Sequence, residues 1–142
     1  MMSVTHLHPL SVHFPIALII VGFFAEIAFL IFKKQSYLFD LGFYLLIIGT
    51  ISATLALFTG AMFTSEMKGI AGEIQETHEL LAWITISILV FTSLLRIFLK
   101  AKNNNNYRLK WLVFFLYLLA AVFIGLTGYY GGTLVYNYMM PL

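Results

Sequence analysis

The chain has 142 residues, of which 61% are hydrophobic and only 10% are charged, and its net charge is +2. An average soluble domain has about 25% charged residues, so this chain has too few charges for a water-facing surface and is expected to lie mostly in lipid. The absence of cysteine excludes disulfides, thiolate-held iron–sulfur clusters and covalent haem attachment. The sequence contains no hydrolytic triad, phosphate loop or nucleic-acid-binding surface.

Four apolar stretches, each near the roughly 20 residues that a bilayer requires, predict four transmembrane helices. They cover residues 15–32, 41–63, 80–99 and 111–136, and the third helix is expected to start earlier, near Glu73. Short connections make consecutive helices antiparallel, which predicts an all-α, up-and-down four-helix bundle. The asparagine run at residues 103–106 predicts a solvated turn. We find no linker and no convincing repeat, so residues 1–142 are expected to form one membrane domain.

The basic residues predict how the bundle is oriented. Only Lys68 lies beside the second connection, whereas the other seven of the eight basic residues lie near the first and third connections: Lys33, Lys34, Arg96, Lys100, Lys102, Arg108 and Lys110. The positive-inside rule places those two connections in the cytoplasm. Both termini are therefore expected on the outer, periplasmic side of a bacterial inner membrane. The N-terminus lacks the basic region of a signal peptide, so the first span is expected to be an uncleaved anchor.

All the histidines fall on the predicted outer side. His13 lies 20 residues before Lys33 and His78 lies 22 residues before Lys100, which corresponds to roughly 30 Å and 33 Å of helix. The two imidazoles are therefore expected at a similar depth, on diagonal helices of the bundle. Histidine is a common metal ligand, and polar residues in a membrane are often functional, although interfacial histidines also simply bind water or backbone.

The start of the first helix leaves two geometries open for His13. If Pro9 opens the helix, His13 lies inside it and Pro15 kinks it. If the helix starts near Pro15, His13 precedes it in extended chain. His8 is too far from His13 for the same helical face, so it is expected to reach a site only through an irregular segment. His6 is expected to be solvated.

Small residues recur on one face of the second and fourth spans, and Gly128 and Gly132 are expected to face the bundle interior. Such stripes are typical of close helix packing in membranes, and glycine also lets a flat macrocycle lie against a helix. Glu26 is the one carboxylate deep inside a span. It is expected to pair with Arg96 rather than to join the histidines.

Residues 8–18, with the sequence HPLSVHFPIAL, are similar to the opening signature of a bacterial membrane family catalogued as domain of unknown function 2231. The resemblance covers nearly the whole chain and includes residues 131–136 at the end of the fourth span. Its other matching residues are Glu26, Thr59, Gly60 and His78. Asn137 and Tyr138 stand where members often have another histidine. The resemblance implies a membrane protein without an assigned activity, and relatives joined to redox domains imply electron transfer by association.

The leading expectation is a haem b protein for electron transfer, with His13 and His78 as axial ligands and Gly128 and Gly132 beside the cofactor. Bis-imidazole ligation needs no cysteine and leaves no open position on the iron, which suits electron transfer better than oxygen chemistry. The expected partners are the lipid bilayer and a quinol or a periplasmic or membrane redox protein.

Two other functions stay open. Copper, zinc or another transition metal could be bound or transported by His8, His13 and His78, because histidine and methionine suit copper. The methionines on the same side are Met62, Met67, Met139 and Met140. The third possibility is a non-catalytic scaffold subunit of a membrane complex. Each of these functions describes a binding or electron-transfer subunit rather than a stand-alone enzyme, and none involves nucleic acid.

Overall fold

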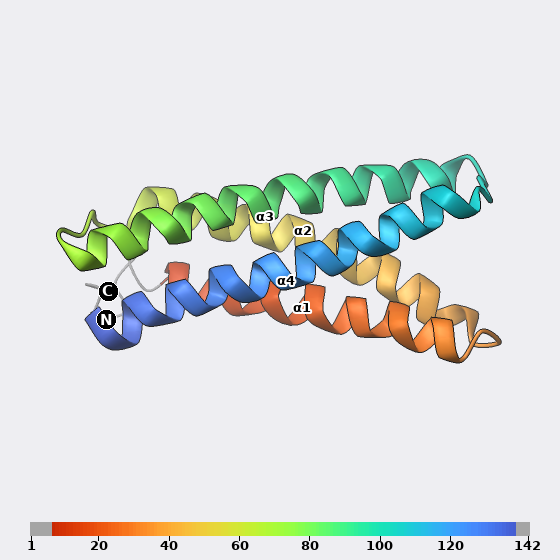
Figure 1. Cartoon of the computed structure of the whole chain (residues 1–142), viewed down its shortest axis with the longest axis horizontal. Helices are drawn as coiled ribbons and strands as arrows, with labels where there is room; N and C mark the ends of the chain where they lie inside the picture. The colour runs from red at the N-terminus through yellow and green to blue at the C-terminus, as the bar shows by residue number, and fades with distance from the viewer. Residues whose placement is uncertain (1–6, 139–142) are drawn as a thin grey trace.

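The computed structural model describes residues 7–138, which form four helices in an up-and-down arrangement (Figure 1). Their bounds are α1 (Leu7–Ile31), α2 (Ser36–Phe63), α3 (Ile70–Ala101) and α4 (Tyr107–Tyr138). All four predicted helices are confirmed. The helices α3 and α4 begin before the predicted spans, because polar residues such as Glu73 and Arg108 extend each helix beyond its apolar stretch.

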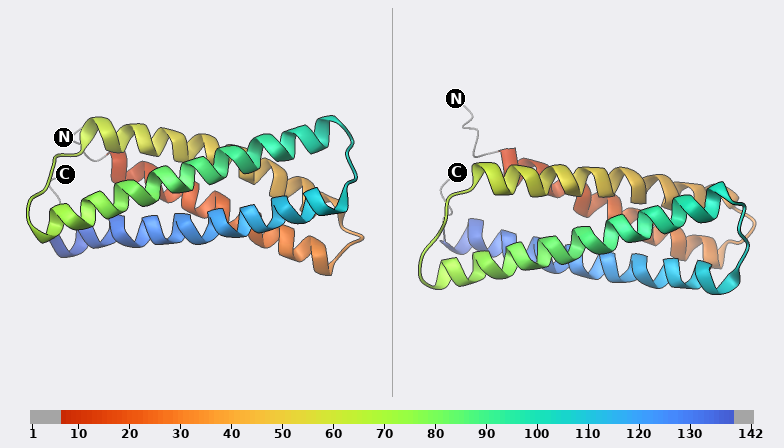
Figure 2. Two further views of the ribbon diagram at one scale, coloured as in Figure 1. Left: turned by 45° about the horizontal axis from the view of Figure 1, so that its top comes forward. Right: turned by 90° about the horizontal axis from the view of Figure 1, so that it is seen from above.

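The bundle has two ends that differ in what they carry. Helix α1 starts and helix α4 ends at the end that also holds the α2–α3 connection, residues 64–69, and we call this the terminal end (Figures 1 and 2). The opposite end holds the α1–α2 connection, residues 32–35, and the α3–α4 connection, residues 102–106, and we call it the loop end.

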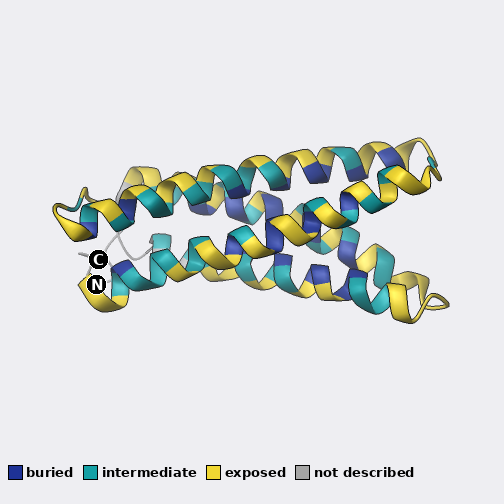
Figure 3. Cartoon of the chain, in the orientation of Figure 1, coloured by how far each residue is buried: buried dark blue, intermediate teal, exposed yellow. Residues whose placement is uncertain are grey.

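Every helix is long and apolar enough to cross a membrane, over Ser11–Ile31, Ser36–Met62, Ile70–Ala101 and Tyr107–Tyr138. Exposed residues cover the outside of the bundle along its whole length (Figure 3). Many of them are large and apolar, and Phe24, Leu55, Trp83 and Leu94 are each more than half exposed. Exposure of these apolar side chains to water would be unfavourable, whereas exposure to lipid would not.

Helix α1 settles where the histidines of the N-terminal segment lie. It starts at Leu7 and continues through Pro15. Pro9 falls in the first turn, where backbone N–H groups have no intrahelical acceptor, so its missing N–H costs little. His13 therefore lies inside the helix, as the first of the two predicted geometries requires. The expectation of an irregular segment at His8 is wrong, because His8 belongs to the regular first turn.

The two halves of the bundle repeat each other. Helix α1 corresponds to α3 with an offset of 70 residues, so that Ile31 at the end of α1 matches Ala101 at the end of α3 (31 + 70 = 101). Helix α2 corresponds to α4 with an offset of 71, so that Ser36 matches Tyr107 (36 + 71 = 107). The hairpin α1–α2 and the hairpin α3–α4 are thus two copies of one plan, which the sequence alone does not reveal.

The centre of the core follows this repeat. Ile19, Leu46, Leu89 and Tyr117 are all fully buried, one from each helix. Ile19 and Leu89 differ by 70 positions, and Leu46 and Tyr117 differ by 71. Apolar side chains from both hairpins therefore close the middle of the bundle and separate its two ends. Diagonal helices contact one another through side chains that point into the bundle.

Candidate functional site

His8 lies at the terminal end and points from α1 towards α2. Its Nδ1 is 3.0 Å from the carbonyl oxygen of Ala56 and 3.3 Å from the hydroxyl of Thr59. The hydroxyl of Ser11 donates to the carbonyl of His8 at 2.9 Å and lies 3.0 Å from the hydroxyl of Thr59. This network fixes the ring of His8 against the second helix of its own hairpin.

His78 has the same arrangement in the other hairpin. Its Nδ1 is 2.9 Å from the carbonyl oxygen of Thr127 on α4. The hydroxyl of Thr127 lies 3.0 Å from that of Thr85, which follows His78 by about two helical turns on α3. His8 and its acceptor are 48 residues apart, and His78 and its acceptor are 49 residues apart. The two histidines are therefore equivalent residues of the repeat.

The hydrogen bonds determine which nitrogen of each ring is available. A carbonyl oxygen only accepts, so Nδ1 carries the proton in both rings, and the neutral ring keeps a lone pair on Nε2. Metal-ligating histidines commonly donate one ring N–H to a carbonyl and bind the metal through the other nitrogen. His8 lies outside the apolar span that starts at Ser11, and burial lowers its pKa below the ordinary value. Its ring is therefore neutral at pH 7.

The two rings face each other across the diagonal of the bundle. Their centroids are 6.3 Å apart and their planes meet at 74°. An ion bound by both Nε2 atoms lies about 2 Å from each nitrogen, and with roughly 1 Å more to each ring centre the centroids are about 6 Å apart. The observed centroid separation of 6.3 Å is close to this value.

A glycine supports each ring. A Cβ atom placed on Gly60 would lie 2.9 Å from Cε1 of His8, and one placed on Gly131 would lie 3.0 Å from Cε1 of His78. The distance at Gly60 is shorter than real Cβ contacts and the one at Gly131 is tighter than nine in ten of them, so an added methyl group at either position would displace the imidazole. Gly60 and Gly131 are also equivalent in the repeat (60 + 71 = 131).

The predicted pair of Glu26 and Arg96 is confirmed at the loop end. Nη2 of Arg96 donates to Oε1 of Glu26, and both side chains are buried. The same guanidinium donates to the carbonyl of Phe39 at 3.3 Å. Gly42 leaves the room for the carboxylate, because a Cβ there would collide with Oε1 of Glu26.

The ion pair and the histidine pair involve the same face of α1 and the same face of α3. Glu26 follows His8 by 18 residues (26 − 8), and Arg96 follows His78 by 18 residues (96 − 78). Eighteen residues are five helical turns and about 27 Å. His8 and Glu26 therefore lie on one face of α1, and His78 and Arg96 lie on one face of α3. Helices α1 and α3 thus meet through two equivalent pairs, one at each end of the bundle.

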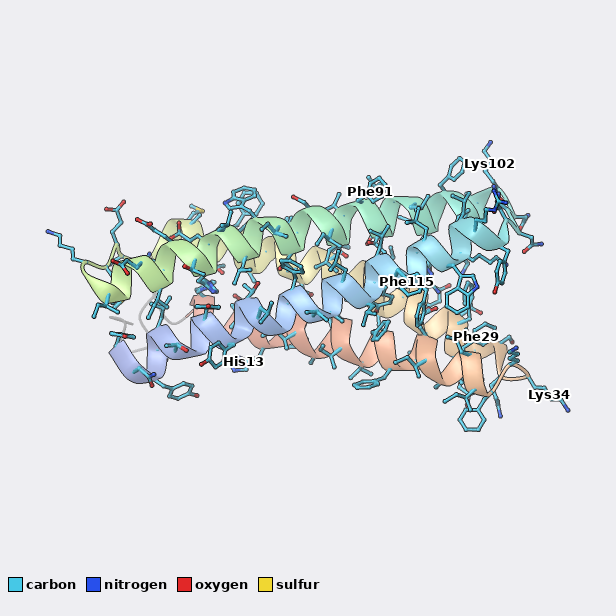
Figure 4. All side chains as sticks on the ribbon, in the orientation of Figure 1. His13, Phe29, Lys34, Phe91, Lys102 and Phe115 are labelled. Carbon is cyan, nitrogen blue, oxygen red and sulfur yellow. The ribbon has the colours of Figure 1, made fainter. Side chains whose placement is uncertain are left out.

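The other predicted site residues lie differently. His13 is exposed on the outer side of α1 (Figure 4), and it is His8 whose ring contacts that of His78. Five residues separate His8 from His13, which is a rotation of about 140° beyond one full helical turn. The two side chains therefore point in different directions, and only that of His8 faces inward. His6, Met139 and Met140 lie outside the described residues.

Of the two predicted interior glycines, only Gly128 packs against another helix. A Cβ on Gly128 would lie 2.9 Å from Cδ1 of Ile16, whereas a Cβ on Gly132 would meet nothing within 4 Å. Gly132 therefore makes no close contact with another helix, and its neighbour Gly131 is the glycine that lies against His78. The offsets of 70 and 71 that relate His8 to His78 and Gly60 to Gly131 become visible only from the helix bounds and contacts.

No group of three or more histidine, cysteine, aspartate or glutamate side chains that could hold a metal occurs among residues 7–138. The two imidazoles therefore make a two-ligand site within the described part of the chain. Structural zinc takes four protein ligands and catalytic zinc takes three, so this geometry fits zinc less well than an ion whose remaining ligands come from a cofactor.

The chain belongs to the family described as predicted membrane protein (DUF2231), whose model matches residues 5–141. The family match and the four long apolar helices make it a multi-pass membrane protein. No curated protein and no solved structure matches the chain.

Proposed function

We propose that this member of the DUF2231 family binds haem b between its two hairpins and transfers electrons, with His8 and His78 as the axial ligands. The observation that carries the proposal is the pair of imidazoles whose ring centroids are 6.3 Å apart, each hydrogen-bonded through Nδ1 to a backbone carbonyl. His8 replaces His13, which the sequence analysis favoured, because His13 is exposed.

Charge and coordination favour haem over a bare divalent ion. Two neutral imidazoles leave both charges of a divalent cation uncompensated at the edge of the apolar region, which is unfavourable. The porphyrin supplies four nitrogens and two negative charges, so the iron needs only two protein ligands. His8 and His78 would hold the haem through their Nε2 atoms, and the haem would supply reversible one-electron chemistry.

The ring environment supports a ligand role in a second way. Gly60 lies against the ring of His8 and Gly131 lies against that of His78. The hydroxyl of Thr59 contacts Nδ1 of His8, and the carbonyl of Thr127 accepts from Nδ1 of His78, so both rings are held in orientation. Among the residues that matched the family signature, Thr59, Gly60 and Gly131 thus lie against His8 or His78. A merely structural pair of histidines would not require a glycine beneath each ring.

Copper is the second candidate, since it accepts imidazole ligands and a low coordination number in its monovalent state. The observation in its favour is that the site offers two protein ligands among the described residues. A scaffold subunit without cofactor is the third possibility, in which the two rings would simply bind water.

We further propose that the terminal end faces the periplasm of a bacterial inner membrane. Seven of the eight basic residues lie near the loop end, and the positive-inside rule places such loops in the cytoplasm. An alkaline phosphatase reporter fused after Leu142 should be active. An inactive phosphatase together with an active cytoplasmic reporter at the same position would reverse the orientation, and the electron partner would then be cytoplasmic.

The function is tested by the absorption spectrum of the purified protein after expression with added haem precursor. The proposal predicts a low-spin spectrum whose bands shift on reduction, with one haem per chain. A colourless protein that contains one copper ion per chain would favour the second candidate. A colourless protein without metal, after adequate haem supply, would contradict both and leave the scaffold.

A further inference from the structure

A cavity of about 200 Å³ opens at the loop end, away from the histidine pair. Its wall includes three cationic side chains, Arg96, Lys100 and Lys110, and one carboxylate, Glu26. Lys100 and Lys110 are exposed, so the cavity reaches the surface of the bundle. Its deeper wall is apolar and includes Leu99 and Val113 from α3 and α4.

Arg96 directs hydrogen-bond donors into this cavity. The two hydrogen bonds that it makes within the described chain, to Glu26 and to the carbonyl of Phe39, both come from Nη2. No described side-chain nitrogen is buried without a partner, so Nε and Nη1 of this buried residue are accessible where it lines the cavity. Glu26 neutralises the single positive charge of the guanidinium through Nη2, so Nε and Nη1 contribute N–H donors and not net charge to the cavity.

The asparagine turn adds further donors. The amide oxygen of Asn104 accepts from the backbone N–H of Asn106 at 2.9 Å, and that of Asn105 accepts from Nζ of Lys110 at 2.8 Å. Because both oxygens are engaged, the NH₂ groups of these amides are what the side chains can offer to a ligand. Both asparagines line the cavity.

We propose that this cavity binds the phosphate group of an acidic phospholipid, of the phosphatidylglycerol class. Guanidinium, ammonium and amide N–H groups converge on one small space, and this donor set suits phosphate oxygens. The polar rim with an apolar wall lies at the membrane edge of the bundle, where a headgroup and the start of its acyl chains meet. Free phosphate shares the headgroup's chemistry, and the experiment separates the two.

The positive-inside rule does not explain this convergence, because that rule requires only that basic residues lie in the loop. Lys34 and Lys102 satisfy it while pointing away from the bundle (Figure 4), and neither lines the cavity. They provide a matched control, since replacing either pair of lysines with glutamine removes two positive charges from the same end.

The experiment titrates dioleoyl phosphatidylglycerol into the full-length protein in an uncharged detergent and measures thermal stability. Dioleoyl phosphatidylcholine and inorganic phosphate are titrated in parallel. The lipid with the anionic headgroup should raise the melting temperature, and phosphatidylcholine should not. The Lys100→Gln/Lys110→Gln variant should bind phosphatidylglycerol about 25-fold more weakly, at about fivefold for each lysine. The Lys34→Gln/Lys102→Gln variant should bind within about twofold of wild type.

Equal weakening in both double variants would mean diffuse charge attraction and would overturn the proposal, as would equal stabilisation by phosphatidylcholine. If inorganic phosphate alone stabilises the protein through the same two lysines, the phosphate chemistry stands and the occupant is the free ion. Nζ of Lys100 also lies 2.9 Å from Oδ1 of the exposed Asp40, and the single variant Lys110→Gln leaves this ion pair intact. It should still weaken binding about fivefold if the double variant does not fold.

Discussion

At the terminal end, the diagonal helices α1 and α3 meet through two imidazoles, whereas at the loop end they meet through Glu26 and Arg96. The positions are equivalent in the repeat, five turns apart on each helix. The charges of Glu26 and Arg96 at the loop end neutralise each other, and the carbonyl of Phe39 accepts a further hydrogen bond from the guanidinium. The two Nε2 lone pairs at the terminal end cannot satisfy each other, because both are acceptors. The loop end therefore carries a closed ion pair beside the proposed phosphate cavity, whereas the terminal end carries the two imidazoles that we propose as haem ligands.

The largest expected effect comes from breaking the loop-end contact. Arg96→Met leaves the carboxylate of Glu26 buried without its partner, which should destabilise the protein by about 3–5 kcal/mol. Thermal unfolding in detergent measures the loss. Removing both charges, as in Glu26→Leu/Arg96→Met, should restore most of the stability, because the isolated charge and not the missing pair is what costs free energy.

The exchange variant Glu26→Arg/Arg96→Glu sharpens this test. Since the two positions are equivalent across the repeat, the exchanged pair should approach the stability of the wild type more closely than either single variant does. A wild-type melting temperature for Arg96→Met would show that the carboxylate is not held as a buried charge, and the contrast between the two ends would fail.

The second effect tests the glycines at the terminal end. Gly60→Ala and Gly131→Ala each push a methyl group against an imidazole, and overpacking of this kind costs roughly 1–3 kcal/mol. Both variants should lower the melting temperature and shift the haem bands to a similar degree. Gly125→Ala and Gly132→Ala are the controls, since a Cβ at either position meets nothing within 4 Å.

If the four alanine variants behave alike, glycine acts there through helix propensity and not through the imidazoles. A large effect of Gly60→Ala with none for Gly131→Ala would contradict the equivalence of the two rings.

The fold was largely predictable because lipid imposes one simple condition, a run of apolar residues long enough to cross. The pairing of Glu26 with Arg96 was also predictable, since each is an isolated charge in a span. The choice of His8 over His13 was not, because two nearby prolines left the start of α1 open. Depth counted from the lysines pointed to His13, whereas the 18-residue spacing from the ion pair points to His8. Few identical residues mark the repeat, so helix boundaries and contacts were needed to see it.

The smallest effect concerns the exposed pair of Lys100 and Asp40, whose charged atoms are 2.9 Å apart. Asp40→Asn should change stability by less than about 1 kcal/mol, because solvent screens such pairs. It should also strengthen the binding of phosphatidylglycerol, because a competing carboxylate is removed from Lys100. Weaker binding in this variant, measured by the same lipid titration, would contradict the assignment of Lys100 to the phosphate site.

The most direct test of the central claim compares three histidine variants by absorption spectroscopy of the purified protein. His8→Ala and His78→Ala should each abolish the low-spin spectrum or convert it to a five-coordinate one, because each removes one axial ligand. His13→Ala, on the same helix as His8 but exposed, should keep the wild-type spectrum. An unchanged spectrum in His8→Ala, or a spectrum lost in His13→Ala, would contradict a haem held between His8 and His78.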